Sequence, residues 1–151
     1  MSDPSDRSEE AAYSCPVCDT RIAGAPAPPP FDAPCPDCGY MLWCRKKMMG
    51  GVAVLHVVPG RTPEHGEVEQ LGEALERPGG GPRVIVELSA LDFMSSAFIA
   101  RLVALNKRIR AAGGKLVLCG LHPFVREAFH DSRLERIFEI ADDEKAALAS
   151  F

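Results

Sequence analysis

Residues 84–97 read Val84-Ile85-Val86-Glu87-Leu88-Ser89-Ala90-Leu91-Asp92-Phe93-Met94-Ser95-Ser96-Ala97. The stretch begins with an apolar, β-branched run typical of a buried strand, and a long amphipathic pattern follows the two serines. It therefore predicts a strand, a turn and a helix in succession. Serine is a favoured N-cap residue, so Ser95 or Ser96 is expected to accept a hydrogen bond from a free backbone N–H of the helix.

Strand and helix patterns alternate on both sides of this stretch. Apolar runs predict strands over residues 52–58, 83–88, 115–119 and 137–140. Apolar residues at helical spacing predict helices over residues 67–77 and 96–112, a helix that begins near Pro123, and a last helix from Asp142. Strands separated by helices favour right-handed crossovers, so we expect an α/β fold with a mainly parallel or mixed sheet.

Two dicysteine motifs precede the α/β region, and they are the most specific pattern in the chain. They are Cys15-Pro16-Val17-Cys18 and Cys35-Pro36-Asp37-Cys38, separated by residues 19–34. This spacing predicts a four-cysteine zinc site in a zinc-ribbon-like module. Four thiolate ligands leave no open position on a tetrahedral zinc ion, so the ion is expected to be structural.

Other interpretations of the cysteines are weaker, but two stay open. Iron would accept the same four ligands, and Cys44 follows closely enough to substitute for one of them. Disulfides are disfavoured because the N-terminus lacks an apolar signal peptide, which indicates a cytoplasmic chain with reduced thiols. Neither motif adjoins a strand-helix-strand unit, as a thioredoxin-like redox site would. Cys119 ends an apolar run and is interpreted as a small buried hydrophobe.

The chain is predicted to divide into three parts. Residues 1–13 form a disordered tail, residues 14–44 the zinc-ribbon-like module, and residues 45–151 the α/β domain. The proline-rich segment Ala23 to Pro30 is interpreted as a stiff loop between the two cysteine motifs. Arg45-Lys46-Lys47 is interpreted as a solvated linker. The module and the α/β domain are not expected to have a core in common.

Composition excludes several classes of function. A net charge of −4 gives no reason to expect nucleic acid or an anionic membrane as a partner. No stretch approaches the ~18 consecutive apolar residues of a membrane span. Glycine-rich nucleotide-binding motifs are missing, and no histidine is paired at a telling spacing with a nucleophile. The sequence therefore points away from an enzyme.

From about Gly51 to its end, the chain resembles the STAS domain of bacterial anti-sigma factor antagonists. The likeness is carried by residues 84–97, by the stretch Gly113-Gly114-Lys115-Leu116-Val117-Leu118-Cys119-Gly120, and by residues 123–138. It implies a STAS-like sheet and a phosphorylatable serine at the turn. By position that serine is Ser96, and Ser95 stands where aspartate is frequent.

The resemblance also implies a partner-switching mechanism that regulates transcription. The unphosphorylated domain would bind an anti-sigma factor, a serine kinase of the histidine-kinase-like ATPase fold, and so free a sigma factor. Phosphorylation of Ser96 would separate the complex, and a phosphatase would reset it. The expected partner-binding residues are those of the turn: Asp92, Met94, Ser95, Ser96 and Phe98. Phe98 replaces a common glycine, so it either packs inward or changes the partner-facing surface.

Two other functions remain as alternatives. The first is a constitutive STAS scaffold or a transport-complex subunit that phosphorylation does not control. The second is a nucleic-acid-binding zinc protein, which the net negative charge disfavours.

Overall fold

The structure is a computed structural model that describes residues 13–22 and 34–151. Five strands form one mixed sheet in the order β1-β2-β3-β4-β5. β1 pairs antiparallel with β2, whereas β2, β3, β4 and β5 pair in parallel. The strands are β1 (Cys44–Met49), β2 (Val52–Val57), β3 (Arg83–Glu87), β4 (Lys115–Cys119) and β5 (Glu139–Ala141). The predicted α/β fold with a mainly parallel or mixed sheet is confirmed.

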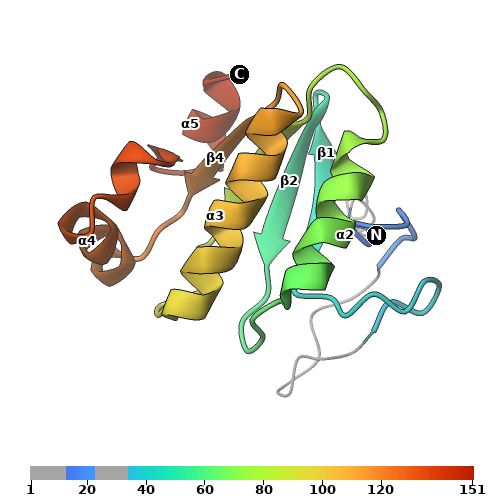
Figure 1. Cartoon of the computed structure of the whole chain (residues 1–151), viewed down its shortest axis with the longest axis horizontal. Coiled ribbons are helices and arrows are strands. Elements are labelled where there is room, and N and C mark those ends of the chain that lie inside the picture. Colours follow the sequence, from blue (N-terminus) through green and yellow to red (C-terminus); the bar gives the residue numbers. More distant parts are fainter. Residues whose placement is uncertain (1–12, 23–33) are drawn as a thin grey trace, which may run out of the picture.

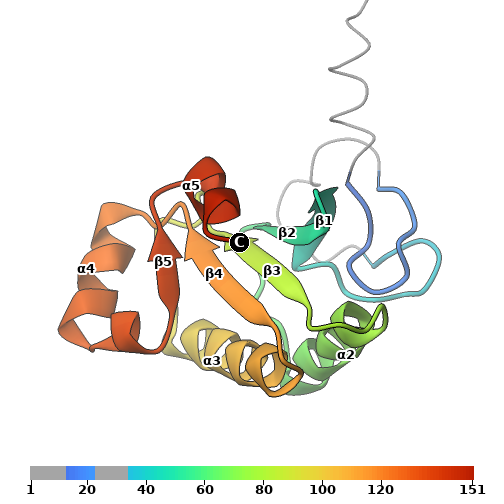
Figure 2. The same ribbon diagram turned by 90° about the horizontal axis from the view of Figure 1, so that it is seen from above.

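Helices cover both faces of the sheet (Figures 1 and 2). They are α2 (His65–Glu76), α3 (Ser96–Ala111), α4 (Pro123–Asp131) and α5 (Glu144–Ala149), with a short 3₁₀ helix η1 (Leu134–Arg136). Figure 2 shows α2 and α3 on one face, α5 on the other, and α4 beyond the β5 edge. Every bound that was predicted for a helix or strand of the α/β region lies within two residues of the observed one.

The alternation of side chains along the strands builds an apolar cluster on each face. On one face Leu55, Val86 and Leu118 belong to the large cluster that also contains the buried residues of α2 and α3. On the other face Val54 and Ile85 belong to a smaller cluster with the buried residue of α5. The two clusters explain why the central strands are apolar along their whole length. No helix in the described ranges is long and apolar enough to cross a membrane.

The first strand was not predicted from the sequence. Arg45, Lys46 and Lys47 lie inside β1 and pair with His56, Leu55 and Val54 of β2, so their interpretation as a solvated linker is wrong. The two lysines are accommodated in the strand because Lys46 pairs with Asp19 and Lys47 with Glu144. On the outer side of β1, Ser14 makes two backbone hydrogen bonds to Lys46, each of 2.8 Å.

The cysteine-rich segment packs against the sheet and shares its core. Val17, Ile22, Tyr40 and Trp43 are at most 8% exposed and belong to the same buried cluster as β2 and α3. The expectation that this segment has no core in common with the rest is therefore wrong. The sequence does not reveal this, because the partners of these apolar side chains are distant in the chain. The division at residues 14–44 and 45–151 remains a prediction, and the proline-rich segment and nearly all of the tail lie outside the described residues.

Candidate partner-binding turn and metal centre

The serine turn connects the end of β3 to the first turn of α3. Ser95 is the N-cap of α3: its backbone is extended (φ −70°, ψ 157°), and its Oγ accepts a hydrogen bond of 3.1 Å from Phe98 N–H. The prediction that one of the two serines caps the helix is confirmed for Ser95. Because the cap hydroxyl is engaged inside the turn, it fixes the backbone that presents Ser96.

Ser96 is the first residue of α3, and it is exposed. The first N–H groups of a helix lack intrahelical partners, and they carry partial positive charge. A negative group on Ser96 would therefore be tolerated by the domain itself. The arrangement offers an accessible hydroxyl at a position that favours an anion.

The other predicted contact residues of the turn differ in accessibility. Asp92 is exposed and Met94 is half-buried. Phe98 is only 4% exposed, and its ring meets the Trp43 ring edge-on at 5.9 Å between centroids. Phe98 was expected either to pack inward or to change the partner-facing surface, and in the structure it packs inward. Its side chain can affect a partner only through the shape of the turn.

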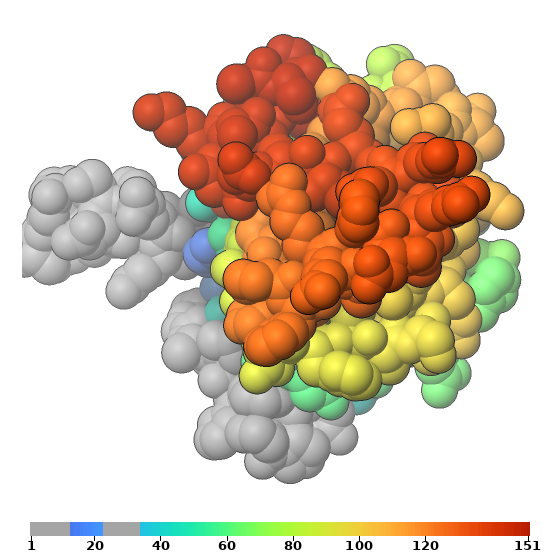
Figure 3. Space-filling view, turned by 90° about the vertical axis from the view of Figure 1, so that its left-hand side faces the viewer, coloured from blue at the N-terminus to red at the C-terminus, as the bar shows by residue number. Residues whose placement is uncertain are grey.

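Two exposed aromatic residues beside the turn were not predicted from the sequence. Phe93 is 75% exposed and Phe124, on α4, is 73% exposed. They line a shallow groove of about 120 Å³ together with Met94, Ile99 and other residues of the turn and α4. Figure 3 shows the start of α3 in yellow beside α4 in orange on one face of the molecule. Exposed apolar patches of this kind often mark interaction surfaces.

A second cavity beside the turn is lined by a cation, and Phe93 and Met94 line both this cavity and the groove. Arg61 lines this cavity, of about 200 Å³, which Ser95, Phe98 and Met94 also line. Its Nη2 donates to both carboxylate oxygens of Glu67 at 2.6 Å, so its charge is balanced within the domain. Glu67 also completes the capping box at the start of α2.

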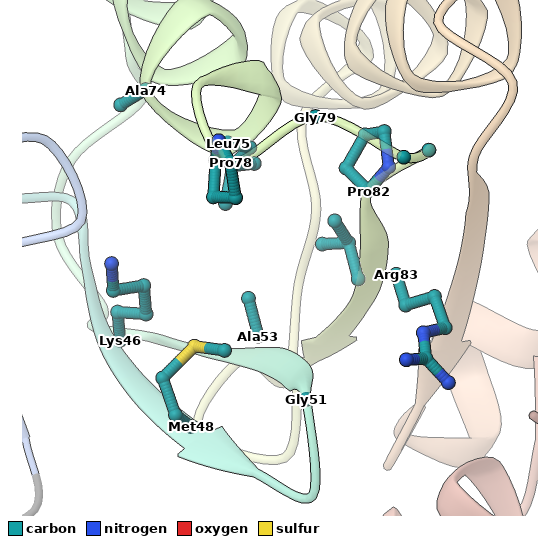
Figure 4. Close-up of a pocket in the computed structure, with 13 residues that line it drawn as sticks. Lys46, Met48, Gly51, Ala53, Ala74, Leu75, Pro78, Gly79, Pro82 and Arg83 are labelled. Carbon is teal, nitrogen blue, oxygen red and sulfur yellow. The ribbon is translucent and has the colours of Figure 1, made fainter.

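A larger cavity lies at the other end of the sheet. It has a volume of about 320 Å³ and lies between the β1–β2 hairpin, the end of α2 and the loop of residues 78–82. Figure 4 shows Lys46 and Met48 on one side of it, facing Leu75 and Pro78. Arg83, at the amino end of β3, also lines it, whereas the serine turn follows the carboxyl end of that strand. This cavity is therefore separate from the turn.

The four predicted metal ligands lie together. The Sγ atoms of Cys15, Cys18, Cys35 and Cys38 are all within 4.8 Å of one another. The Cys15–Cys38 and Cys18–Cys35 separations are 3.7 and 3.6 Å. Tetrahedral zinc with Zn–S bonds of about 2.3 Å requires S···S separations of about 3.8 Å, so the residues fit such an ion. Disulfide bonding would require about 2.05 Å, and the cysteines are free.

The two cysteine motifs have the same local geometry. Val17 N–H and Asp37 N–H each lie 3.4 Å from the Sγ atom of the first cysteine in their motif. Asp19 and Gly39 follow the second cysteines with φ of 67° and 77°, which closes each turn. Backbone N–H groups directed at sulfur stabilise thiolates, the form in which cysteine binds a metal. The four cysteines can therefore hold a metal ion.

The pKa values of the cysteines reflect their surroundings. Burial raises the pKa of Cys15. At Cys18 burial also acts to raise the pKa, but hydrogen bonds with Thr20 and the other cysteines lower it to about 7. Burial raises the pKa of Cys119 to about 12, which fits the buried hydrophobe that was predicted. Cys44 is fully buried, and it is not among the four clustered thiols, so it does not replace any of them.

The fold and the serine turn define the class of protein. The family model of the STAS domain matches residues 65–147, and the chain belongs to this family. A curated relative, the putative anti-sigma factor antagonist BtrV of Bordetella bronchiseptica, is 42% identical over 72 residues. The match covers 48% of this chain and 62% of BtrV, so the chain spans about three fifths of that relative.

Solved structures show the same fold. A STAS domain protein from Planctomyces limnophilus is 26% identical with a TM-score of 0.53, and the match covers 70% of this chain and 96% of that one. The anti-sigma factor antagonist SpoIIAA in its unphosphorylated form is 22% identical with a TM-score of 0.52, covering 71% of this chain and 95% of that one. The STAS-like architecture predicted from the sequence is confirmed.

Proposed function

We propose that the protein is a non-enzymatic, cytoplasmic anti-sigma factor antagonist that phosphorylation of Ser96 switches off. The observation that carries the proposal is the division of roles at the turn. Ser95 is engaged as the cap of α3, while Ser96 is exposed at its first position. Membership of the STAS family and the similarity to BtrV support this function.

The proposed partner is an anti-sigma factor that is also a serine kinase of the histidine-kinase-like ATPase fold. It would contact Asp92, Met94, Ser95 and Ser96 and would extend over the exposed rings of Phe93 and Phe124. Phe98 would support this surface from below. Binding would free a sigma factor, and a phosphatase would restore the unphosphorylated form.

A phosphate on Ser96 would act on the complex and not on the fold. It adds about −1.5 to −2 charges and considerable bulk at an exposed position. The N-terminus of α3 tolerates this charge, whereas a partner packed on the turn would have to accommodate it against its own surface. Phosphorylation is therefore expected to release the partner and to leave the domain folded.

In this proposal the four cysteines hold zinc in a structural role. Their four thiolates complete a tetrahedral shell, so no position remains for substrate or water. Zinc binding is expected to stabilise the segment that carries the two cysteine motifs.

The test compares wild-type protein with Ser96→Asp as bait in a lysate of the native host. We expect an ATPase-fold kinase to be captured by wild type and lost by Ser96→Asp. Gln70→Glu is the matched control, because it adds one negative charge at an exposed position of α2. Equal capture by Ser96→Asp and wild type would overturn the switch and favour a constitutive scaffold.

The second part of the test addresses the modification itself. The captured kinase, incubated with ATP, is expected to phosphorylate wild type and not Ser96→Ala, as measured by intact-protein mass spectrometry. Phosphate found on Ser96→Ala would assign the modification to another residue.

A further inference from the structure

The cysteine-rich segment and the serine turn are connected by a short series of buried contacts. It begins in the second cysteine motif, where Cys35 N–H donates to the Tyr40 carbonyl oxygen at 2.8 Å. Tyr40 is 3% exposed, and its hydroxyl accepts a hydrogen bond of 2.8 Å from Trp43 Nε1. The same hydroxyl donates to the backbone carbonyl of Glu67 in α2 at 2.7 Å. Tyr40 thus links the metal-binding motif to α2.

The series continues from Trp43 to the turn itself. Trp43 is 1% exposed, and it is among the largest fully buried side chains in the described residues. Its edge-on contact with Phe98 links the cysteine-rich segment directly to the serine turn. The N–H of Phe98 donates the hydrogen bond that Ser95 Oγ accepts. The N-cap bond of α3 therefore depends on a residue whose ring rests on Trp43.

These contacts are closely packed, so a change at one end is expected to reach the other. Besides the thiol contacts, one exposed hydrogen bond of 2.8 Å, from Thr20 Oγ1 to Asp37 Oδ2, joins the two motifs. Without a metal these weak contacts would hold the second motif less firmly, and the segment that leads to Tyr40 and Trp43 would lose its strongest link to the first motif. A displaced Trp43 would leave a void beside Phe98. Buried aromatic side chains respond to such a void by shifting, because the interior is packed at crystal-like density.

We propose that the metal at the four-cysteine site positions the serine turn through Trp43 and Phe98. The turn has its partner-binding geometry only when the metal is bound. Trp43 and Phe98 are positioning residues in this device, because neither contacts the metal and neither is exposed to a partner. The role of the turn in partner binding rests on the proposed function, but the coupling between the metal site and the turn does not.

The first experiment measures hydrogen exchange of the full chain with zinc and after removal of zinc by a chelator. We expect the amides of Phe98 and Ile99, which donate to Ser95, to exchange about tenfold faster without zinc, within the usual range for coupling between two sites. The amides of β4 serve as the internal control and should stay protected. Unchanged exchange at Phe98 and Ile99, together with lost protection at residues 35–43, would overturn the proposal. So would loss of protection throughout the chain, because the metal would then maintain the whole fold.

The second experiment uses the reciprocity of coupling. If metal binding and the packing of Phe98 stabilise each other, then a change that loosens the packing at Phe98 should weaken metal binding. We expect Phe98→Leu to raise the zinc dissociation constant about fivefold, measured by competition with a chromophoric chelator. Phe129→Leu is the matched control, because Phe129 is equally buried but packs on Phe138. Equal zinc affinity of Phe98→Leu and wild type would overturn the proposal.

Neither experiment involves the protein partner. If Ser96→Asp still captures the partner while the zinc experiments succeed, the proposed switch fails and the coupling stands. If the zinc experiments fail while the partner is lost as expected, the coupling fails and the switch stands.

Discussion

Ser95 and Ser96 are adjacent and chemically identical, but their positions at the start of α3 give them different roles. The Ser95 hydroxyl accepts from Phe98 N–H, whereas Ser96 is exposed at the first helical position. The sequence indicates that a cap lies here but not which serine provides it, because both satisfy the pattern. The choice depends on the residue at which the backbone changes from extended to helical, and that residue is Ser95.

Alanine substitutions at the two serines should lower the stability of the protein by different amounts. Ser95→Ala removes the acceptor for Phe98 N–H, so we expect the free energy of unfolding to fall by about 1 kcal/mol. Ser96→Ala removes an exposed hydroxyl and should change it by less than about 0.5 kcal/mol. Urea denaturation of the zinc-loaded proteins measures both values. An equal loss of unfolding free energy in the two variants would show that the Ser95 cap does not stabilise α3 more than Ser96 does.

The zinc content of alanine variants should show that Cys35 is a metal ligand and that Cys44 is not. Cys35→Ala removes one of the four clustered sulfurs, so we expect the purified protein to lose most of its zinc. Cys44→Ala leaves that cluster intact and should retain the zinc content of the wild type, although it loses some buried contacts. Elemental analysis per chain provides the measurement. Loss of zinc from Cys44→Ala would make Cys44 a ligand.

At the scale of elements, the parallel strands and the helices around them could be predicted because their apolar periodicity is local. β1 could not be predicted, because Arg45-Lys46-Lys47 interrupts any apolar pattern. This strand forms because its backbone pairs with β2, and that pairing leaves no pattern in the local sequence. The serine turn could be predicted from one continuous stretch. The groove beside it could not, since Phe93 and Phe124 come together only when α4 packs near α3. Contacts distant in sequence leave no periodic pattern.

The groove between the turn and α4 should contribute to partner binding without contributing to stability. Phe93→Ser and Phe124→Ser remove rings that are mostly exposed, so the unfolding free energy should change by less than about 1 kcal/mol. Partner capture should fall for each variant, because these rings are the largest apolar surfaces beside Ser96. Met48→Ser is the control, since Met48 is 54% exposed on β1 and does not line the groove. Full capture by both phenylalanine variants would restrict the partner surface to the turn.

At the scale of the whole molecule, the cysteine-rich segment completes the sheet domain at one side. Figure 2 shows it beside β1 and α2. Ser14 pairs with the outer side of β1, and Arg77 at the end of α2 donates to the Val17 carbonyl oxygen at 3.4 Å. Val17, Ile22 and Trp43 bury apolar surface that β1, β2 and α2 would otherwise expose to water. The stability of the sheet domain should therefore depend partly on the metal.

Removal of the metal should lower the stability of the whole chain but unfold only part of it. Zinc at about a thousandfold excess over its dissociation constant stabilises a protein that binds it only when folded by about 4 kcal/mol. With a chelator, we expect residues 14–22 and 34–44 to lose protection from hydrogen exchange while the central strands β3 and β4 keep theirs. Calorimetry of the same sample should show the remaining transition at a lower temperature, because the apolar surface under Val17 and Trp43 is then exposed. If chelation instead melted the chain in a single transition near room temperature, the division at residue 44 would be wrong, and the metal would be part of one cooperative fold.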